Sequence, residues 1–138
     1  MTRLALALGL VLLAGAHAAA EHEVFYRYTV LGYVTDGGGR PVVDAQLALM
    51  RDKTGFSYLG DTDAQGFYLI VARLGDESAG ERLTLRYGRA AARVVAGFDP
   101  ANHADERGTR VDFEGGRAVE RAAWFRSTLL KTVGKERP

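Results

Sequence analysis

Apolar and polar residues alternate in short segments from residue 24 onward, a pattern that is typical of half-buried β-strands. The clearest case is residues 82–87, in which leucine and tyrosine alternate with arginine and threonine. Residues 67–72 are apolar at both alternating sets of positions, which predicts a central strand that is covered on each side. The full set of predicted strands is residues 24–35, 45–50, 56–62, 67–72, 82–87, 89–96 and 111–114.

Two glycine-containing turns organise the first half of this pattern. Residues 36–39 are Asp-Gly-Gly-Gly and tolerate positive φ, so the chain can reverse sharply there. Pro41 fixes φ where the next strand begins, and we therefore expect a hairpin between the first two predicted strands. Residues 63–66 repeat the device, with Asp63 at the start of the turn and Gly66 at its end.

The turns and their flanking strands carry a resemblance to a known family. Its residues are Gly32, Val34, Asp36, Gly39, Pro41, Val42, Ala45, Leu47, Thr62, Asp63, Gly66 and Tyr68. This pattern resembles the carboxypeptidase regulatory-like domain, a transthyretin-like (prealbumin-like) β-sandwich that is appended to some metallocarboxypeptidases and occurs in many secreted bacterial proteins. The resemblance covers residues 28–90. Because its residues are turn and core positions, it implies a fold and says almost nothing about a ligand.

The spacing of the strands favours an all-β fold. Turn signals separate them at intervals of about ten residues, which is typical of an antiparallel sandwich and not of a parallel α/β sheet. We therefore expect an antiparallel, transthyretin-like sandwich of about seven strands. This domain is predicted over residues 21–116, between a leader at residues 1–20 and a basic tail at residues 117–138.

The tail predicts a short amphipathic helix. Apolar residues recur at helical spacing, namely Ala122, Phe125, Leu129 and Val133. A helix is expected over residues 119–133, ended by Gly134, with basic residues on its remaining surface. Its apolar stripe, with Trp124 beside it, is interpreted in two ways. Covering the sandwich itself is the favoured interpretation, and docking on a partner protein or on an anionic membrane surface is the other.

Residues 1–20 have the pattern of a cleavable secretory signal peptide. Arg3 supplies a positive start, residues 4–14 form an apolar run, and small residues precede Glu21. The run is shorter than the about 20 apolar residues that span a bilayer, which argues against a membrane anchor. Since the sequence contains no cysteine, the leader is not a lipoprotein signal and the fold uses no disulfides. We expect a periplasmic or secreted protein.

Composition and motifs argue against several classes of function. The 18 basic and 17 acidic side chains nearly balance, whereas proteins that bind nucleic acid usually carry a marked basic excess. No serine lies in a Gly-x-Ser-x-Gly sequence, and a hydrolytic triad that uses His103 is disfavoured. Neither the zinc-ligand cluster of a metallocarboxypeptidase nor the histidine-rich site of the related hydroxyisourate hydrolases is present. We therefore expect a protein that is not an enzyme and uses no cofactor.

Two groups of residues raise the question of metal binding. His22 would lie beside a free amino terminus after cleavage of the leader, and an amine, an imidazole and backbone nitrogens together suit Cu(II). A frayed polar start before the first strand is the favoured interpretation of His22. Asp36, Asp44, Asp61 and Asp63 offer oxygen ligands for Ca²⁺, but turn capping explains these residues with fewer assumptions.

Binding of a partner is the leading hypothesis for function. Residues 98–108 are the longest polar interruption of the strand pattern and form the most natural recognition loop, and the basic helix adds a second surface. The candidate partner-binding residues are Phe98, Asn102, His103, Trp124, Phe125 and Arg126. The expected partner is a protein or another component of the cell envelope. The alternative is a carrier for a small ligand, either a carbohydrate or a metal ion, which would be held in part by exposed tyrosines.

Overall fold

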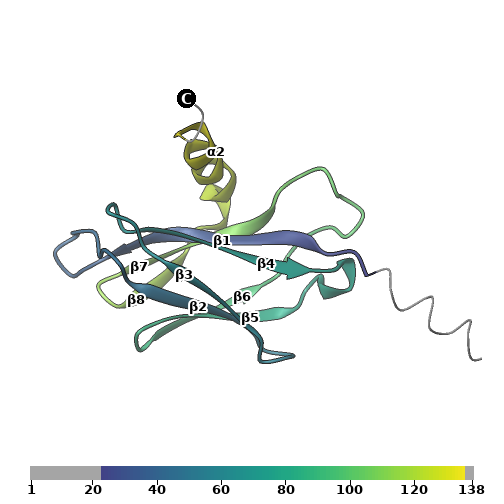
Figure 1. Cartoon of the computed structure of the whole chain (residues 1–138), viewed down its shortest axis with the longest axis horizontal. Coiled ribbons are helices and arrows are strands. Elements are labelled where there is room, and N and C mark those ends of the chain that lie inside the picture. Colours follow the sequence, from purple (N-terminus) through teal and green to yellow (C-terminus); the bar gives the residue numbers. More distant parts are fainter. Residues whose placement is uncertain (1–22, 136–138) are drawn as a thin grey trace, which may run out of the picture.

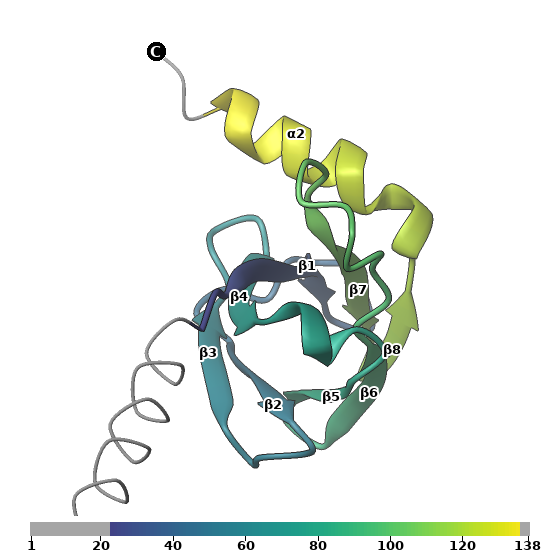
Figure 2. The same cartoon turned by 90° about the vertical axis from the view of Figure 1, so that its right-hand side faces the viewer.

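The computed structural model describes residues 23–135 and shows two four-stranded β-sheets packed face to face, with one helix on the outside (Figure 1, Figure 2). The first sheet has the order β4-β1-β7-β8, with bounds Phe67–Leu74, Tyr26–Thr35, Arg107–Glu114 and Arg117–Glu120. The second sheet has the order β3-β2-β5-β6, with bounds Ser57–Asp61, Gln46–Arg51, Arg82–Tyr87 and Ala90–Val95. The helical elements are η2 (Asp76–Ser78), η3 (Ala122–Trp124) and α2 (Phe125–Lys135).

This architecture confirms the predicted all-β sandwich with a short C-terminal helix. All strand pairs are antiparallel except β1 and β7, which run parallel. The described residues contain eight strands. The predicted signal peptide at residues 1–20 and the candidate metal ligand His22 lie outside the described residues. Within residues 23–135, no helix is long and apolar enough to cross a membrane.

The hydrophobic core lies between the sheets and is built from the inward set of each alternating strand. β1 contributes Tyr28 and Val30, and β5 contributes Leu83 and Leu85. Both leucines have no exposed surface, while the arginines that alternate with them are exposed. The period-2 pattern thus places one face of each sheet in the core, as strand geometry requires.

The turn at residues 36–39 forms, but the predicted hairpin does not. One antiparallel bridge joins Thr35 to Pro41. Beyond it the chain leaves the first sheet, and β2 pairs with β3 and β5 in the second sheet. The physical reason is that Asp44 adopts φ +56° and redirects the chain, so that its N–H donates to the carbonyl of Thr62 at 3.1 Å. The turn at residues 63–66 likewise connects β3 of one sheet to β4 of the other.

β4 lies at the edge of the first sheet, so its prediction as a central strand is wrong. Its second apolar set is half-buried because β3 lies close to β4 where the two sheets meet. At this seam a Cβ placed on Gly60 would lie 2.6 Å from Cγ1 of Ile70. Glycine at residue 60 therefore makes room for the side chain of Ile70 from the other sheet.

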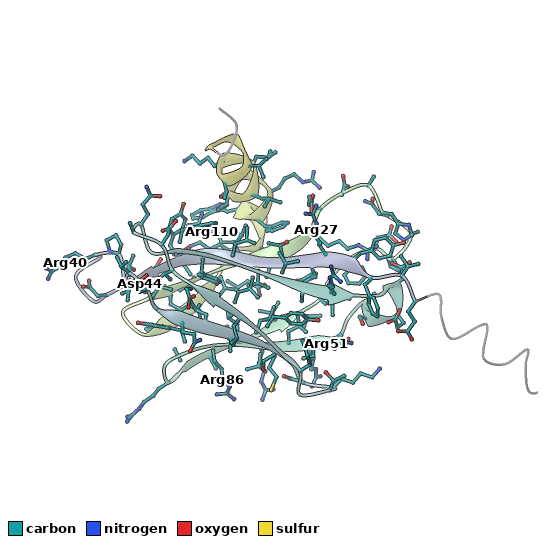
Figure 3. The ribbon with its side chains drawn as sticks, in the orientation of Figure 1. Arg27, Arg40, Asp44, Arg51, Arg86 and Arg110 are labelled. Carbon is teal, nitrogen blue, oxygen red and sulfur yellow. The ribbon has the colours of Figure 1, made fainter. Side chains whose placement is uncertain are left out.

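The two turns pack against each other in one corner of the sandwich (Figure 3). Asp36 accepts hydrogen bonds from the N–H groups two and four residues ahead, at 2.9 Å each. Asp63 makes the same pair at 2.8 and 3.0 Å. The N–H of Val34 donates to the carbonyl of Gly66 at 2.8 Å and joins the turns. The aspartates therefore cap turns, which is the interpretation that the sequence favoured over calcium ligation.

Two further residues of the family pattern hold this corner. Thr62 is buried, and its hydroxyl accepts from the N–H of Ala45 at 2.8 Å and donates to the carbonyl of Val42 at 2.6 Å. Gly66 adopts φ +75°, and a Cβ on it would lie 2.5 Å from the carbonyl oxygen of Val34. Glycine is required there because both the dihedral angle and the space exclude a side chain.

The ladder between β1 and β7 is interrupted at Gly32 and Tyr33. The carboxylate of Asp112 accepts the N–H of Tyr33 at 2.9 Å, and the hydroxyl of Tyr68 donates to the carbonyl of Val111. A Cβ on Gly32 would lie 1.9 Å from that carbonyl oxygen, so the interruption needs glycine. It leaves a carboxylate on the outer face of the sheet, close to where the helix begins.

The C-terminal segment departs from the predicted single helix over residues 119–133. Residues 117–120 form β8, so the first sheet continues past the expected start of the tail, and α2 begins at Phe125. Gly134 does not end the helix, which extends to Lys135. A four-residue strand is too short for its alternation to be told from the start of a helical pattern.

Candidate partner-binding surface

Helix α2 lies against the outer face of the first sheet, on the side away from the second sheet (Figure 2). Phe125 anchors it: the side chain is 6% exposed, and a Cβ on Gly108 of β7 would lie 2.6 Å from its ring. Thr128, one turn later, is also buried. Leu130 and Val133 are 66% and 46% exposed. The helix is thus held by its first turn, and its later turns present apolar side chains to solvent.

Asp112 organises the charges beneath the helix. Its side chain is 4% exposed, and a carboxylate so deeply buried needs paired charges to offset its desolvation. Arg110 supplies a two-pronged contact at 3.0 to 3.1 Å, and Arg121 donates to the same carboxylate. Arg121 also binds Glu114 at 2.7 Å, and hydrogen bonds to Glu114 and Asp112 raise the pKa of its guanidinium. The cluster therefore fixes both guanidinium groups.

These two guanidinium groups hold Trp124, which is 53% exposed. The Cζ atoms of Arg110 and Arg121 lie 5.3 and 5.4 Å from the centre of the indole ring, within the range of cation–π attraction. Arg110 also lies 5.1 Å from the ring of Tyr33. A groove of about 670 Å³ opens between the helix and the sheet, lined by Tyr33, Arg110, Trp124, Ser127, Thr128 and Lys131. Trp124 is therefore an exposed aromatic side chain on a fixed support.

The connection between β6 and β7 corresponds to the predicted recognition loop, although residues 107 and 108 belong to β7. It folds around Arg107, whose side chain is 6% exposed. Nη2 of Arg107 donates to the carbonyls of Asp99 and Asn102 at 3.3 and 3.0 Å. The guanidinium carbon lies 4.0 Å from the ring centre of Phe98 and 4.9 Å from that of Tyr26. A buried cation thus gives this polar loop a defined shape.

His103 lies at the outer side of the same loop. Its ring stacks on Tyr26 at 4.4 Å, and Nε2 lies 2.9 Å from Oδ2 of Asp76. Hydrogen bonds from His103 and Arg107 hold the pKa of Asp76 below its ordinary value. His103 is 47% exposed, and among the described residues no serine hydroxyl is hydrogen-bonded to it. In a serine hydrolase the nucleophilic hydroxyl is hydrogen-bonded to the histidine, and no described serine is placed in this way beside His103.

The loop and the helix meet at an ion pair. Nη2 of Arg126 lies 3.6 Å from Oδ2 of Asp105. Next to this contact is a hollow of about 210 Å³, and its lining includes Phe98, Asn102 and Arg126. The structure thus brings three of the predicted residues together. His103 lines a neighbouring hollow of about 170 Å³ that shares Arg107.

The remaining predicted residues have different surroundings. Trp124 lines the groove between the helix and the sheet. Phe125 is buried against the sheet, where it positions the helix. Sequence reasoning missed Arg110, which lines the groove with Tyr33, Trp124 and Lys131. The sequence did point to exposed tyrosines and to the basic residues of the helix, but not to their meeting in one groove. The only sequence signal for Arg110 was the alternation of charged and apolar residues along β7. The first half of this strand was not predicted. Within residues 23–135, no group of three or more His, Cys, Asp or Glu side chains is placed to hold a metal ion.

The fold and the surface together define an eight-stranded β-sandwich with a docked helix and an ordered loop beside it. In comparisons with known proteins, no family model and no curated protein sequence matches this chain. The resemblance to the carboxypeptidase regulatory-like domain therefore stays an interpretation of the residues between Gly32 and Tyr68.

Proposed function

We propose that this protein is an exported, non-catalytic binding module that recognises a protein of the cell envelope through the surface formed by α2 and the β6–β7 loop. The observation that supports this most is the ion pair between Arg126 and Asp105, with the hollow beside it. Two segments that the sequence marks separately as recognition elements are thereby adjacent in space (Figure 2). Export is inferred from the pattern of residues 1–20.

The side chains on this surface are of the kinds that dominate protein interfaces. Tryptophan and arginine are enriched among residues that carry most of the binding energy. Trp124 is held by Arg110 and Arg121 before any partner arrives, so its ordering costs little on binding. Leu130 and Val133 add exposed aliphatic area on the adjoining turns. Lys131 forms no ion pair with a described carboxylate, which favours a partner with an acidic rim.

Site-specific photocrosslinking tests the proposal. A photoreactive phenylalanine analogue at Leu130 should crosslink one discrete protein in the envelope fraction of the natural host. The same analogue at Val95, which is 58% exposed on β6 of the other sheet, is the matched control and should not yield that product. Trp124→Ala should weaken the crosslink at Leu130. A product that is absent at both positions, or equal at both, would count decisively against a partner at this surface.

A second candidate function is the binding of an acidic carbohydrate in the groove beside Trp124. The observation that favours it is the combination of Tyr33, Trp124 and Lys131, which offers aromatic rings and a cation to one ligand. Because Trp124 is the one tryptophan in the chain, its fluorescence reports on this groove directly. Uronic acid oligosaccharides should shift the emission of the wild type and not that of Lys131→Gln. Emission that does not change at millimolar ligand would exclude this alternative.

A further inference from the structure

Among residues 23–135, no element covers the outer face of the second sheet, whereas α2 lies over the outer face of the first (Figure 1). In β5 and β6 the inward set is apolar and fully buried, namely Leu83, Leu85 and Val94. The outward set includes Arg82, Arg86 and Arg93, all of them exposed. No helix within residues 23–135 covers these arginines, and Figure 3 shows Arg86 pointing away from the sandwich on the side opposite to α2.

The strand register places the three arginines close together. Thr84 pairs with Arg93, so Arg82 and Arg86 lie diagonally across from Arg93 on the same face. Diagonal neighbours in an antiparallel pair lie about 7 to 8 Å apart, with their Cβ atoms somewhat closer. Of the described carboxylates, none forms an ion pair with any of the three guanidinium groups. Three free cations therefore share one small area of the sheet.

The residues around this area keep it positive. Arg89, in the turn between β5 and β6, and Lys53, in the turn after β2, are both exposed. The carboxylates nearest in register are those of Asp52 and Asp61, at the ends of β2 and β3. Asp52 accepts a hydrogen bond from Thr84 at 2.6 Å. The three unpaired guanidinium groups and the two cations of the adjoining turns thus form a local basic excess, although the whole chain is close to neutral.

Aliphatic side chains interrupt the arginines. Leu59 is 64% exposed and Val95 is 58% exposed. Leu59 pairs with Ala48, which pairs in turn with Arg86, and Val95 pairs with Arg82. The face therefore alternates exposed cations with exposed aliphatic groups on one sheet surface. Clusters of cations with adjacent apolar residues are the combination that binds the interface of an anionic lipid bilayer.

We propose that the outer face of β2, β3, β5 and β6 docks on an anionic phospholipid surface. Arg82, Arg86 and Arg93 contact the headgroup phosphates, and Leu59 and Val95 enter the boundary with the acyl chains. Charge complementarity selects the lipid, since each basic residue near such a surface adds about 1 kcal/mol of attraction. This face is opposite to α2, so the lipid contact and the proposed partner surface do not compete. Membrane contact through the helix, considered from the sequence alone, is a different prediction.

Vesicle binding measured by sedimentation tests this proposal, using the protein without the predicted leader at residues 1–20. The probes are vesicles of phosphatidylcholine with about one third phosphatidylglycerol, and vesicles of phosphatidylcholine alone. The wild type should bind the anionic vesicles and release at high salt. Arg86→Gln with Arg93→Gln should lower the partition coefficient about 25-fold, because about 1 kcal/mol per residue corresponds to a factor of about five. Arg82→Gln with Arg86→Gln should give the same loss and serves as a second variant if the first folds poorly.

A control removes equal charge from the other side of the molecule. Arg73→Gln with Arg117→Gln takes two exposed cations from β4 and β8, the edge strands of the first sheet, and should leave the partition coefficient within about twofold. Equal losses in both double variants would mean general charge attraction and would overturn a defined lipid face. A loss confined to the control would place the contact at the first sheet and would also overturn it. Binding of soluble heparin through these arginines, with no binding to vesicles, would identify an acidic glycan as the occupant instead.

Discussion

The turn corner and the surface under α2 both contain buried polar groups, but they use them for different ends. In the corner, Thr62 and Asp63 satisfy backbone groups of their own neighbourhood, and Gly66 makes room for them. Under the helix, Asp112 binds two guanidinium groups that in turn hold the exposed Trp124. The polar groups of the corner bind only their neighbours in the fold, whereas those under the helix support an exposed side chain.

This difference explains what the family resemblance can and cannot say. Nearly every polar or glycine residue that carries it acts within the fold, as Gly32 does at the ladder interruption and Thr62 in the corner. The proposed recognition surface uses Arg110, Trp124 and Arg126, which are not part of that pattern. A chain can therefore share the corner with many proteins and still have a binding surface of its own.

Within the corner, the largest loss of stability is expected on substitution of Gly66. Gly66→Ala combines a left-handed φ of +75° with a Cβ that would lie 2.5 Å from the carbonyl oxygen of Val34. We expect a loss of about 3 kcal/mol in the free energy of unfolding, measured by urea denaturation. Gly55→Ala is the matched control, since Gly55 has φ +74° and open space around it, and it should cost about 1 kcal/mol. Equal losses would show that dihedral strain alone, and not the close approach, requires glycine at residue 66.

Thr62→Val should have the next largest effect. The substitution keeps the shape of the side chain but leaves the N–H of Ala45 and the carbonyl of Val42 without that hydroxyl. Because these groups are part-buried, we expect a loss of about 2 kcal/mol in the free energy of unfolding. Thr54→Val is the control, because the Thr54 hydroxyl accepts a hydrogen bond from Phe56 in an exposed turn. A loss below about 0.5 kcal/mol for Thr62→Val would mean that water replaces the hydroxyl in the corner.

Much of the fold was predictable because local chemistry and burial agree along the strands. Alternation located seven of the eight strands, and the Asp-Gly turns form where the sequence places them. Which strands pair was not predictable from the turns alone. The pairing of β1 with β7 joins residues that are far apart in the sequence, and no local signal distinguishes a hairpin from a corner between sheets. The prediction that β4 is a central strand was wrong. Its second apolar set is covered by β3, where the two sheets meet, and not by another element packed on the outer face of the sheet.

The site was predictable only in part, and for a similar reason. Phe98, Asn102 and Arg126 were identified from a polar loop and a basic helix, and they do meet. Phe125 was included because apolar helix residues look alike in sequence whether they face a sheet or a partner. Arg110 was missed because its importance comes from Asp112, Arg121 and Trp124, three positions that converge only after β7 and the helix have formed.

Acid should loosen the recognition loop where it is held by Asp76. The pKa of Asp76 is lower in the folded protein than in the unfolded chain, so its stabilising contribution is fully present above the unfolded value of about 3.9. That contribution is lost as pH falls through the folded value. We expect amide exchange near His103 to rise selectively below about pH 4, relative to the rate trend of an unstructured peptide. Asp76→Asn should show fast exchange already at neutral pH. A uniform response of loop and corner would contradict an independent role for Asp76.

The smallest effect on stability is expected at Trp124, and this sets the two regions apart most clearly. Trp124 is half exposed, and its contacts with Arg110 and Arg121 are of a kind worth about 0.5 to 1 kcal/mol at exposed sites. Trp124→Ala should therefore lower the free energy of unfolding by about 1 kcal/mol or less while abolishing most of the crosslink at Leu130. Gly66→Ala, at a temperature where it stays folded, should do the reverse and keep the crosslink. If Trp124→Ala instead cost as much as Gly66→Ala, the indole would be part of the structural support of α2, and the helix surface would lose its main anchor for a partner.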